Sequence, residues 1–115
     1  MSFHDLGLDP RLLRAIGKRG FDRPTAVQLE CIPKTLEGKD VIARARTGSG
    51  KTLAYLLPAL HRILLMTAAA ADGSSDSVAR GGQARRGSFN AIVLVPTREL
   101  CEQVRRGEHG VVYQC

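Results

Sequence analysis

Eight consecutive residues have the composition of a loop that holds a nucleotide triphosphate. Two glycines, Gly48 and Gly50, let the backbone curl so that its N–H groups point at phosphate oxygens, where a side chain would obstruct. Lys51 can reach the β- and γ-phosphates, and the Thr52 hydroxyl can ligate a bridging Mg²⁺. A glycine-rich turn with no ligand is the alternative, but Lys-Thr directly after the glycines favours phosphate binding. The candidate nucleotide ligands are Ala45, Arg46, Thr47, Gly48, Ser49, Gly50, Lys51 and Thr52.

The elements around this loop are the ones that a phosphate site requires. The apolar run Val41–Ala43 before the loop predicts a strand, and leucines at helical spacing from Leu53 onward predict a helix after it. The N-terminus of that helix would add its dipole and unpaired amides to the anion site. The first position of the loop is commonly Gly, whereas here it is Ala45, which preserves a tight turn only if its φ is negative.

Two short helices are predicted before the loop. Asp9 as N-cap and Pro10 at the first helical position begin the first one. Thr25 caps the second, which should end at Gly38, and Pro33 should kink it or cost it a hydrogen bond.

The second half of the chain combines a long polar stretch with a short apolar run. Residues 67–88 contain an alanine run, a Ser/Gly/Asp stretch and an arginine cluster, which predict a flexible basic surface insertion. Its arginines could contact nucleic acid or be simply solvated. The apolar run Ala91–Val95 is typical of a parallel strand covered on both faces, and Pro96 then starts another helix. Together the elements predict an α/β fold, with a parallel sheet flanked by helices.

The bulk composition limits the class of protein. The chain has 115 residues, a formal net charge of +6 and a pI near 9.8, which fit one small domain with an anionic partner or merely a basic surface. Cys31, Cys101 and Cys115 are odd in number and widely spaced, which argues against a disulfide framework or zinc site. No secretory leader or bilayer-spanning stretch is apparent, so we expect an intracellular protein with no membrane partner.

Four segments in this order resemble the amino-terminal part of a DEAD-box ATP-dependent RNA helicase. They are Phe3 with Leu6-Gly7-Leu8; Gly20-Phe21-x-x-Pro24-Thr25-x-x-Gln28 with Ile32-Pro33, similar to the Q motif; Ala45 to Thr52, where the family commonly begins its loop with Ala; and Pro96-Thr97-Arg98-Glu99-Leu100, similar to motif Ia, with Cys101 where Ala is usual. The resemblance implies a RecA-like phosphate-loop NTPase fold, here partial, with ATP and Mg²⁺ as cofactors and RNA as partner.

The resemblance also implies roles for two residues of the Q motif. Gln28 would pair with the N6/N7 edge of adenine and select ATP over GTP. Its alternative is a capping box, in which the side chain bonds back to the Thr25 backbone. Phe21 would stack on the base, a contact of about 1–3 kcal/mol, or would be a core residue.

Motif Ia of the family holds the RNA sugar–phosphate backbone without reading sequence. The resemblance carries this role to Pro96, Thr97, Arg98 and Glu99, where hydroxyl, guanidinium and amide donors meet at a helix start. N-capping by Thr97 and a first-turn acid at Glu99 are the plain structural alternatives, and both readings can hold together.

The chain divides into a Q-motif helical region (1–38), the start of a RecA-like ATP-binding domain (39–104, with the insertion 67–88) and a tail (105–115) that departs from the family pattern. Within the tail, Gly107 and Gly110 should break the helix. The Asp-Glu pair that the family uses for hydrolysis does not follow Val104.

The predicted function is therefore an ATP-dependent RNA helicase represented by its nucleotide-binding front end. Lys51 and Thr52 are its predicted catalytic-site residues, and the chain alone is expected to be inactive. A catalytically inactive regulatory or binding fragment, from truncation or alternative splicing, is the alternative. Another phosphate-loop enzyme such as a small kinase is a third reading, against which the Q motif and Pro96 to Leu100 argue. With few sheet neighbours, the isolated chain is expected to be marginally stable.

Residues Glu37 to Thr47 look closest to the nucleolar, ribosome-assembly branch of the family. That resemblance implies a nuclear or nucleolar protein, with ribosome-assembly factors as partners of the full-length form.

Overall fold

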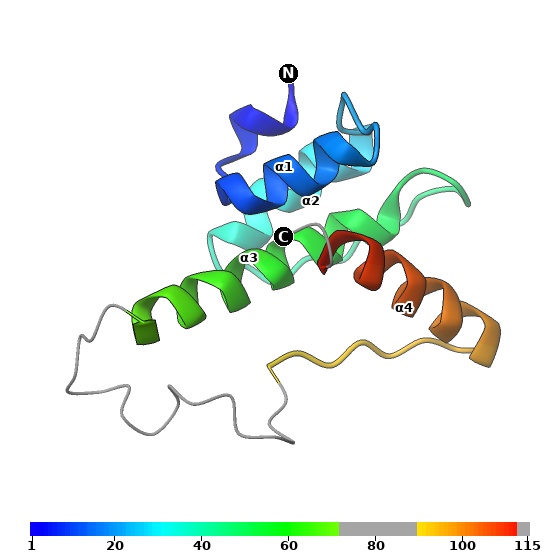
Figure 1. Cartoon of the computed structure of the whole chain (residues 1–115). Helices are drawn as coiled ribbons and strands as arrows, with labels where there is room; N and C mark the ends of the chain where they lie inside the picture. The colour runs from blue at the N-terminus through cyan, green and yellow to red at the C-terminus, as the bar shows by residue number, and fades with distance from the viewer. Residues whose placement is uncertain (72–89, 113–115) are drawn as a thin grey trace.

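Helices account for all the regular secondary structure in the part of the chain that the computed structural model describes, residues 1–71 and 90–112. The structure has a 3₁₀ turn and four α-helices (Figure 1): η1 (Phe3–Leu6), α1 (Pro10–Lys18), α2 (Ala26–Leu36), α3 (Lys51–Ala71) and α4 (Arg98–Val112). The two helices predicted before the loop and the two predicted after it are confirmed.

The start of α1 is fixed by hydrogen bonds to its N-cap residue. Asp9 Oδ1 accepts from the backbone N–H of Arg11 at 2.8 Å and from its guanidinium Nε at 2.9 Å, and Pro10 occupies the first helical position. The backbone N–H of Asp9 donates to His61 Nδ1 at 3.0 Å, which ties the start of α1 to the middle of α3.

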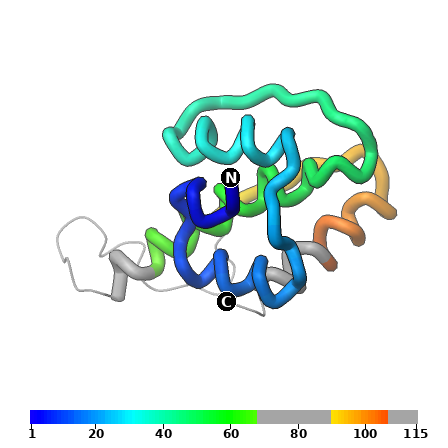
Figure 2. The backbone as a smooth tube through the Cα atoms, turned by 90° about the horizontal axis from the view of Figure 1, so that it is seen from above, coloured from blue at the N-terminus to red at the C-terminus, as the bar shows by residue number. Residues whose placement is uncertain are grey.

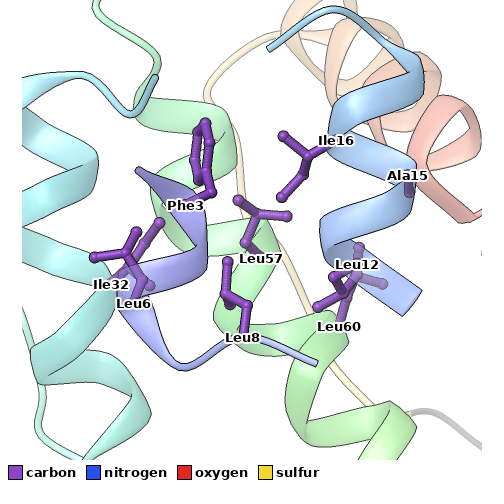
Figure 3. Close-up of a cluster of buried hydrophobic side chains, with 9 residues drawn as sticks. All are labelled: Phe3, Leu6, Leu8, Leu12, Ala15, Ile16, Ile32, Leu57 and Leu60. Carbon is purple, nitrogen blue, oxygen red and sulfur yellow. The ribbon is translucent and has the colours of Figure 1, made fainter. Parts of the chain in front are cut away.

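Two layers of helix enclose the core. In Figure 1, η1, α1 and α2 lie over α3, and α4 contacts both α1 and α3. Figure 3 shows the apolar cluster between the layers, in which the largest side chains that are less than 2% exposed are Leu12, Ile16, Ile32 and Leu57. Each fully buried leucine or isoleucine contributes about 1.5–3 kcal/mol relative to exposure, so this cluster holds the helices together.

The structure corrects the prediction of two strands, because neither segment pairs with a strand in the described part of the chain. Both segments are nevertheless extended with alternating faces. Ala91, Val93 and Val95 line an apolar hollow against α3 and α4, whereas Ile92 and Leu94 are 79% and 90% exposed. A strand exists only through a hydrogen-bonded neighbour, and the described residues supply none to either segment. The predicted parallel sheet is therefore not formed here.

Two helix boundaries also differ from the prediction. The helix α3 extends to Ala71, so residues 67–71 of the predicted insertion are helical, and 72–88 lie outside the described residues. Alanine is the strongest helix former, which explains the extension. The helix α4 runs through Gly107 and Gly110 to Val112, so the predicted break is wrong. A glycine costs a helix only about 1 kcal/mol relative to alanine, which weakens it without ending it.

Candidate nucleotide-binding site

The candidate phosphate loop is a tight turn immediately before α3. The backbone N–H of Ser49 donates to the Arg46 carbonyl at 3.2 Å and closes the turn. Gly48 and Gly50 have φ values of +80° and +85°, in the left-handed region that favours glycine. The helix then begins at Lys51, so its first backbone N–H groups have no carbonyl one turn earlier and are available to an anion.

The Q-motif glutamine contacts the phosphate loop directly. Gln28 is 3% exposed, and its Nε2 donates to the Gly50 carbonyl at 3.0 Å, across 22 residues of sequence. Its Oε1 accepts from the backbone N–H of Thr25 at 2.9 Å. The capping alternative for Gln28 is therefore confirmed, and the same side chain also holds the loop. The helical spacing of Thr25 and Gln28 predicts the cap, but no sequence signal indicated the contact with Gly50.

Close packing at Gly50 explains why the loop needs glycine there. A Cβ at this position would collide with Gln28 Nε2 and lie 3.1 Å from Thr25 Oγ1. At Gly48 a Cβ would meet nothing within 4 Å, so only its positive φ requires glycine. Both glycines thus allow the left-handed backbone of the turn, and Gly50 in addition allows the loop to lie against α2.

The polar side chains of the loop suit a triphosphate. The Lys51 ammonium donates to the Ala45 carbonyl, so it lies across the loop, and the residue is exposed. Ser49 Oγ is buried and has no hydrogen-bond partner among the described residues, which leaves a polar atom of the loop unsatisfied. Thr52 is half-buried in the first turn of α3. Amide N–H groups, an ammonium and hydroxyls are the hydrogen-bond donors that phosphate oxygens require, and a hydroxyl oxygen is a ligand that Mg²⁺ accepts.

A hollow of about 470 Å³ lies beside the loop, between α2 and α3. Lys51 is on its wall, together with Lys39, Asp40 and Tyr55. Because Lys51 is exposed, it is accessible from solvent on this side of the loop.

Phe21 lies on the surface near the start of α2. The residue is 42% exposed, and the Arg19 guanidinium lies over its ring, 5.9 Å from the centroid. The alternative that Phe21 is a core residue is therefore wrong. An exposed ring a few residues from Gln28 has surface for stacking on a base.

The segment similar to motif Ia caps α4. Thr97 Oγ1 accepts from the backbone N–H of Leu100 at 3.2 Å, and its carbonyl accepts from that of Cys101 at 3.1 Å. N-capping by Thr97 is therefore confirmed, and Glu99 lies in the first turn. Pro96, Thr97, Arg98 and Glu99 are all exposed, and Figures 1 and 2 place the start of α4 and the phosphate loop at the same end of α3.

Among the described residues, no cluster of His, Cys, Asp and Glu side chains could hold a metal ion by itself. None of the helices in that part of the chain has the length and apolarity needed to cross a bilayer.

Residues 25–107, which include Gln28, the phosphate loop and the cap of α4, match the DEAD/DEAH box helicase family. The chain belongs to this family. It is 47% identical over 115 residues to DEAD-box ATP-dependent RNA helicase 16 of Oryza sativa subsp. japonica, which is all of this chain and 15% of the relative. It is 52% identical over 103 residues to ATP-dependent RNA helicase dbp9 of Schizosaccharomyces pombe, which is 90% of this chain and 15% of the relative.

The DEAD-box relatives are named as ATP-dependent RNA helicases, so the family uses ATP and acts on RNA. The chain spans about 15% of the length of these relatives. Membership of the DEAD/DEAH box family implies a RecA-like fold, of which the described residues show helices and the two extended segments.

Proposed function

We propose that this chain is the ATP-binding front end of a DEAD-box RNA helicase and contributes to RNA backbone binding. The observation that carries the proposal is the hydrogen bond from Gln28 Nε2 to the Gly50 carbonyl at 3.0 Å. It joins the candidate base-reading residue to the candidate phosphate loop, as a site that binds one nucleotide through both ends requires.

Each end of the nucleotide has its own residues in this proposal. Phe21 stacks on adenine, and Gln28 offers its amide to the N6/N7 edge. Because Gln28 is 3% exposed, a base reaches that edge only if the Thr25–Gln28–Gly50 contacts shift. Residues Ala45 to Gly50 bind phosphates through backbone N–H groups, and Lys51 neutralises the terminal phosphates.

The Thr52 hydroxyl is the residue that would hold Mg²⁺, together with the nucleotide. When bound with the nucleotide, the ion would neutralise phosphate charge. The 115 residues contain no Asp-Glu pair to orient an attacking water, so we propose that this chain binds ATP without hydrolysing it.

The RNA contact is proposed for the exposed start of α4. Thr97 places its backbone N–H and hydroxyl beside a helix N-terminus, and Arg98 adds a guanidinium.

We further propose that Val41–Ala43 and Ala91–Val95 become parallel strands of a RecA-like sheet when neighbouring strands are present, since both are already extended with alternating faces.

Titration with a fluorescent ADP analogue and Mg²⁺, followed by competition with ATP and then GTP, tests the site. The expected result is saturable binding that ATP displaces and GTP displaces poorly. Lys51→Ala should weaken binding at least about tenfold, because a charge-assisted contact to phosphate is lost. Lys34→Ala is the control, because Lys34 is exposed, pairs with Glu30 and changes the net charge equally. Unchanged affinity in Lys51→Ala would overturn the phosphate-loop assignment.

We also propose that the longer protein works in the nucleus or nucleolus with ribosome-assembly factors. The support is the resemblance of Glu37 to Thr47 to that branch of the family. Imaging of a tagged full-length protein tests the location, and exclusion from the nucleus would contradict it.

A further inference from the structure

Most of the excess positive charge of the chain lies in one short stretch. Residues 10–23 carry five basic side chains and one acidic one, whereas the other residues carry twelve basic and ten acidic ones. Four of the six excess charges are therefore found in the helix α1 and the turn that follows it. Apart from Arg19, which lies over the Phe21 ring, this concentration has no role in the nucleotide site described above.

Two of the five basic side chains already have partners. Arg11 binds the Asp9 carboxylate at 2.9 Å, and Arg19 lies over the Phe21 ring. The other three, Arg14, Lys18 and Arg23, are exposed, and no ion pair joins them to a carboxylate in the described part of the chain. These three residues form what we call the α1 basic surface.

The α1 basic surface has a regular geometry. Arg14 and Lys18 are four residues apart on a helix, so they lie on one face about 6 Å apart along its axis. The chain then doubles back over the end of α1, where the backbone N–H of Phe21 donates to the Ile16 carbonyl at 3.2 Å. Arg23 follows two residues later. Leu12, Ala15 and Ile16 anchor α1 in the core, so the basic face points to solvent from a rigid element.

We infer that the α1 basic surface is an RNA phosphate-binding surface, additional to the start of α4. The inference rests on the proposed RNA-binding function. Two unpaired cations on one face of α1, Arg14 and Lys18, with a third, Arg23, in the segment that follows the helix, attract the backbone of a polyanion without reading its bases. RNA is the polyanion that the family acts on, and the turn after α1 leads directly to the Q motif and the phosphate loop, so an RNA strand bound here would lie close to the nucleotide site.

Fluorescence anisotropy with a labelled 20-nucleotide oligouridylate, at KCl concentrations from 50 to 300 mM, tests the surface in the full chain. The variant is Arg14→Gln with Lys18→Gln and Arg23→Gln. We expect its RNA affinity to fall about tenfold at 100 mM KCl. The slope of log affinity against log salt should shrink by about 2, since each phosphate contact in a single strand contributes about 0.7.

A matched triple variant, Lys34→Gln with Arg62→Gln and Arg106→Gln, removes the same net charge from three other exposed residues. It should change RNA affinity less than about twofold. At 100 mM KCl the solvent ions screen charges that do not contact the RNA, so these charges contribute little to binding. Equal losses in both triple variants, or no loss in the first, would overturn the inference. Unchanged ADP-analogue binding by the first variant shows that it is folded.

The outcomes separate this inference from the proposed function. If the wild-type chain binds oligouridylate and only Arg98→Gln weakens that binding, the assignment of RNA binding to the α1 basic surface is wrong and the proposed function stands. If the wild-type chain binds no RNA, both the surface and the RNA part of the proposed function fail. Equal competition by polyglutamate at matched charge would also overturn the inference, in favour of an acidic protein partner.

Discussion

The helical front of the molecule and its two extended segments contain similar residues in opposite situations. In the front, the leucines and isoleucines of η1, α1, α2 and α3 form a closed cluster, with Leu57 completely buried. In the extended segments, Ile42 is fully exposed and Leu94 is 90% exposed. A helix satisfies its backbone within its own sequence, whereas a strand depends on a neighbour that the described residues do not supply.

The difference explains why the nucleotide site is organised although the sheet is not. Gln28 and Gly50 both belong to the ends of packed helices, so their contact needs only α2 and α3. The extended segments contribute Val41 and Ala43 to the hollow beside Lys51, but no hydrogen bond of theirs holds the loop. The comparison therefore predicts large effects of substitution in the front and small ones in the segments.

Leu57→Ala should have the largest effect on stability. The side chain is 0% exposed at the centre of the core, so its removal should lower the free energy of unfolding by about 2–5 kcal/mol through lost burial and a cavity. In a marginally stable chain this loss could unfold the protein, so the helical circular dichroism at 25 °C and urea denaturation should both be measured.

Leu94→Ala is the matched substitution in an extended segment. It should change the free energy of unfolding by less than about 0.5 kcal/mol, as surface substitutions usually do. A loss as large as that of Leu57→Ala would mean that the segment is buried in solution, and the contrast between the two regions would fail.

Gly50→Ala should have the next largest effect, and it tests whether the front holds the site. Alanine at φ +85° is strained by about 1–2 kcal/mol, and its Cβ would displace Gln28. We expect weaker ADP-analogue binding and a loss of preference for ATP over GTP. Gly48→Ala is the control, with the same strain but open space around its Cβ. If Gly48→Ala lost the ATP preference equally, the contact with Gln28 would not be its cause.

Sequence patterns predicted local features of the fold well and distant contacts poorly. Asp9 and Pro10 predicted the start of α1, and Thr25 with Gln28 predicted a cap, because these interactions join residues within one turn. The contact of Gln28 with Gly50 depends on how α2 packs against α3, which no local spacing encodes. The apolar runs predicted strands, and none forms among the described residues, because whether such a run becomes a strand depends on partners elsewhere.

The Asp9 cap should contribute a smaller, pH-dependent part of the stability of the front. Hydrogen bonds from the Arg11 side chain, and then from its backbone, lower the pKa of Asp9 from 3.8 to about 2. Because the folded pKa is depressed, the stabilisation is present above pH 3.8 and is lost as the pH falls toward 2. We expect about 1 kcal/mol, reduced from the full shift because Arg11 is one-third exposed.

Urea denaturation of the wild type and of Asp9→Asn at pH 6, 4, 3 and 2 measures this contribution. The difference in free energy of unfolding between the two proteins should shrink toward zero at pH 2. A difference that stays constant with pH would show that the carboxylate charge does not stabilise the start of α1.

The smallest effect on unfolding is expected from Ile92→Lys with Leu94→Lys, and this pair tests the other side of the comparison. Both side chains point to solvent, so the free energy of unfolding should change by less than about 0.5 kcal/mol.

An unpaired extended segment with exposed apolar residues is, however, a template for pairing between chains, and lysines at such an edge oppose this pairing. We therefore expect sedimentation velocity to show less self-association in the double variant than in the wild type at equal concentration. The substitution Arg14→Lys with Lys18→Arg leaves charge and apolar surface unchanged and is the control. If the wild type is monomeric at high concentration, the extended segments are protected in solution and their exposure does not distinguish them from the front.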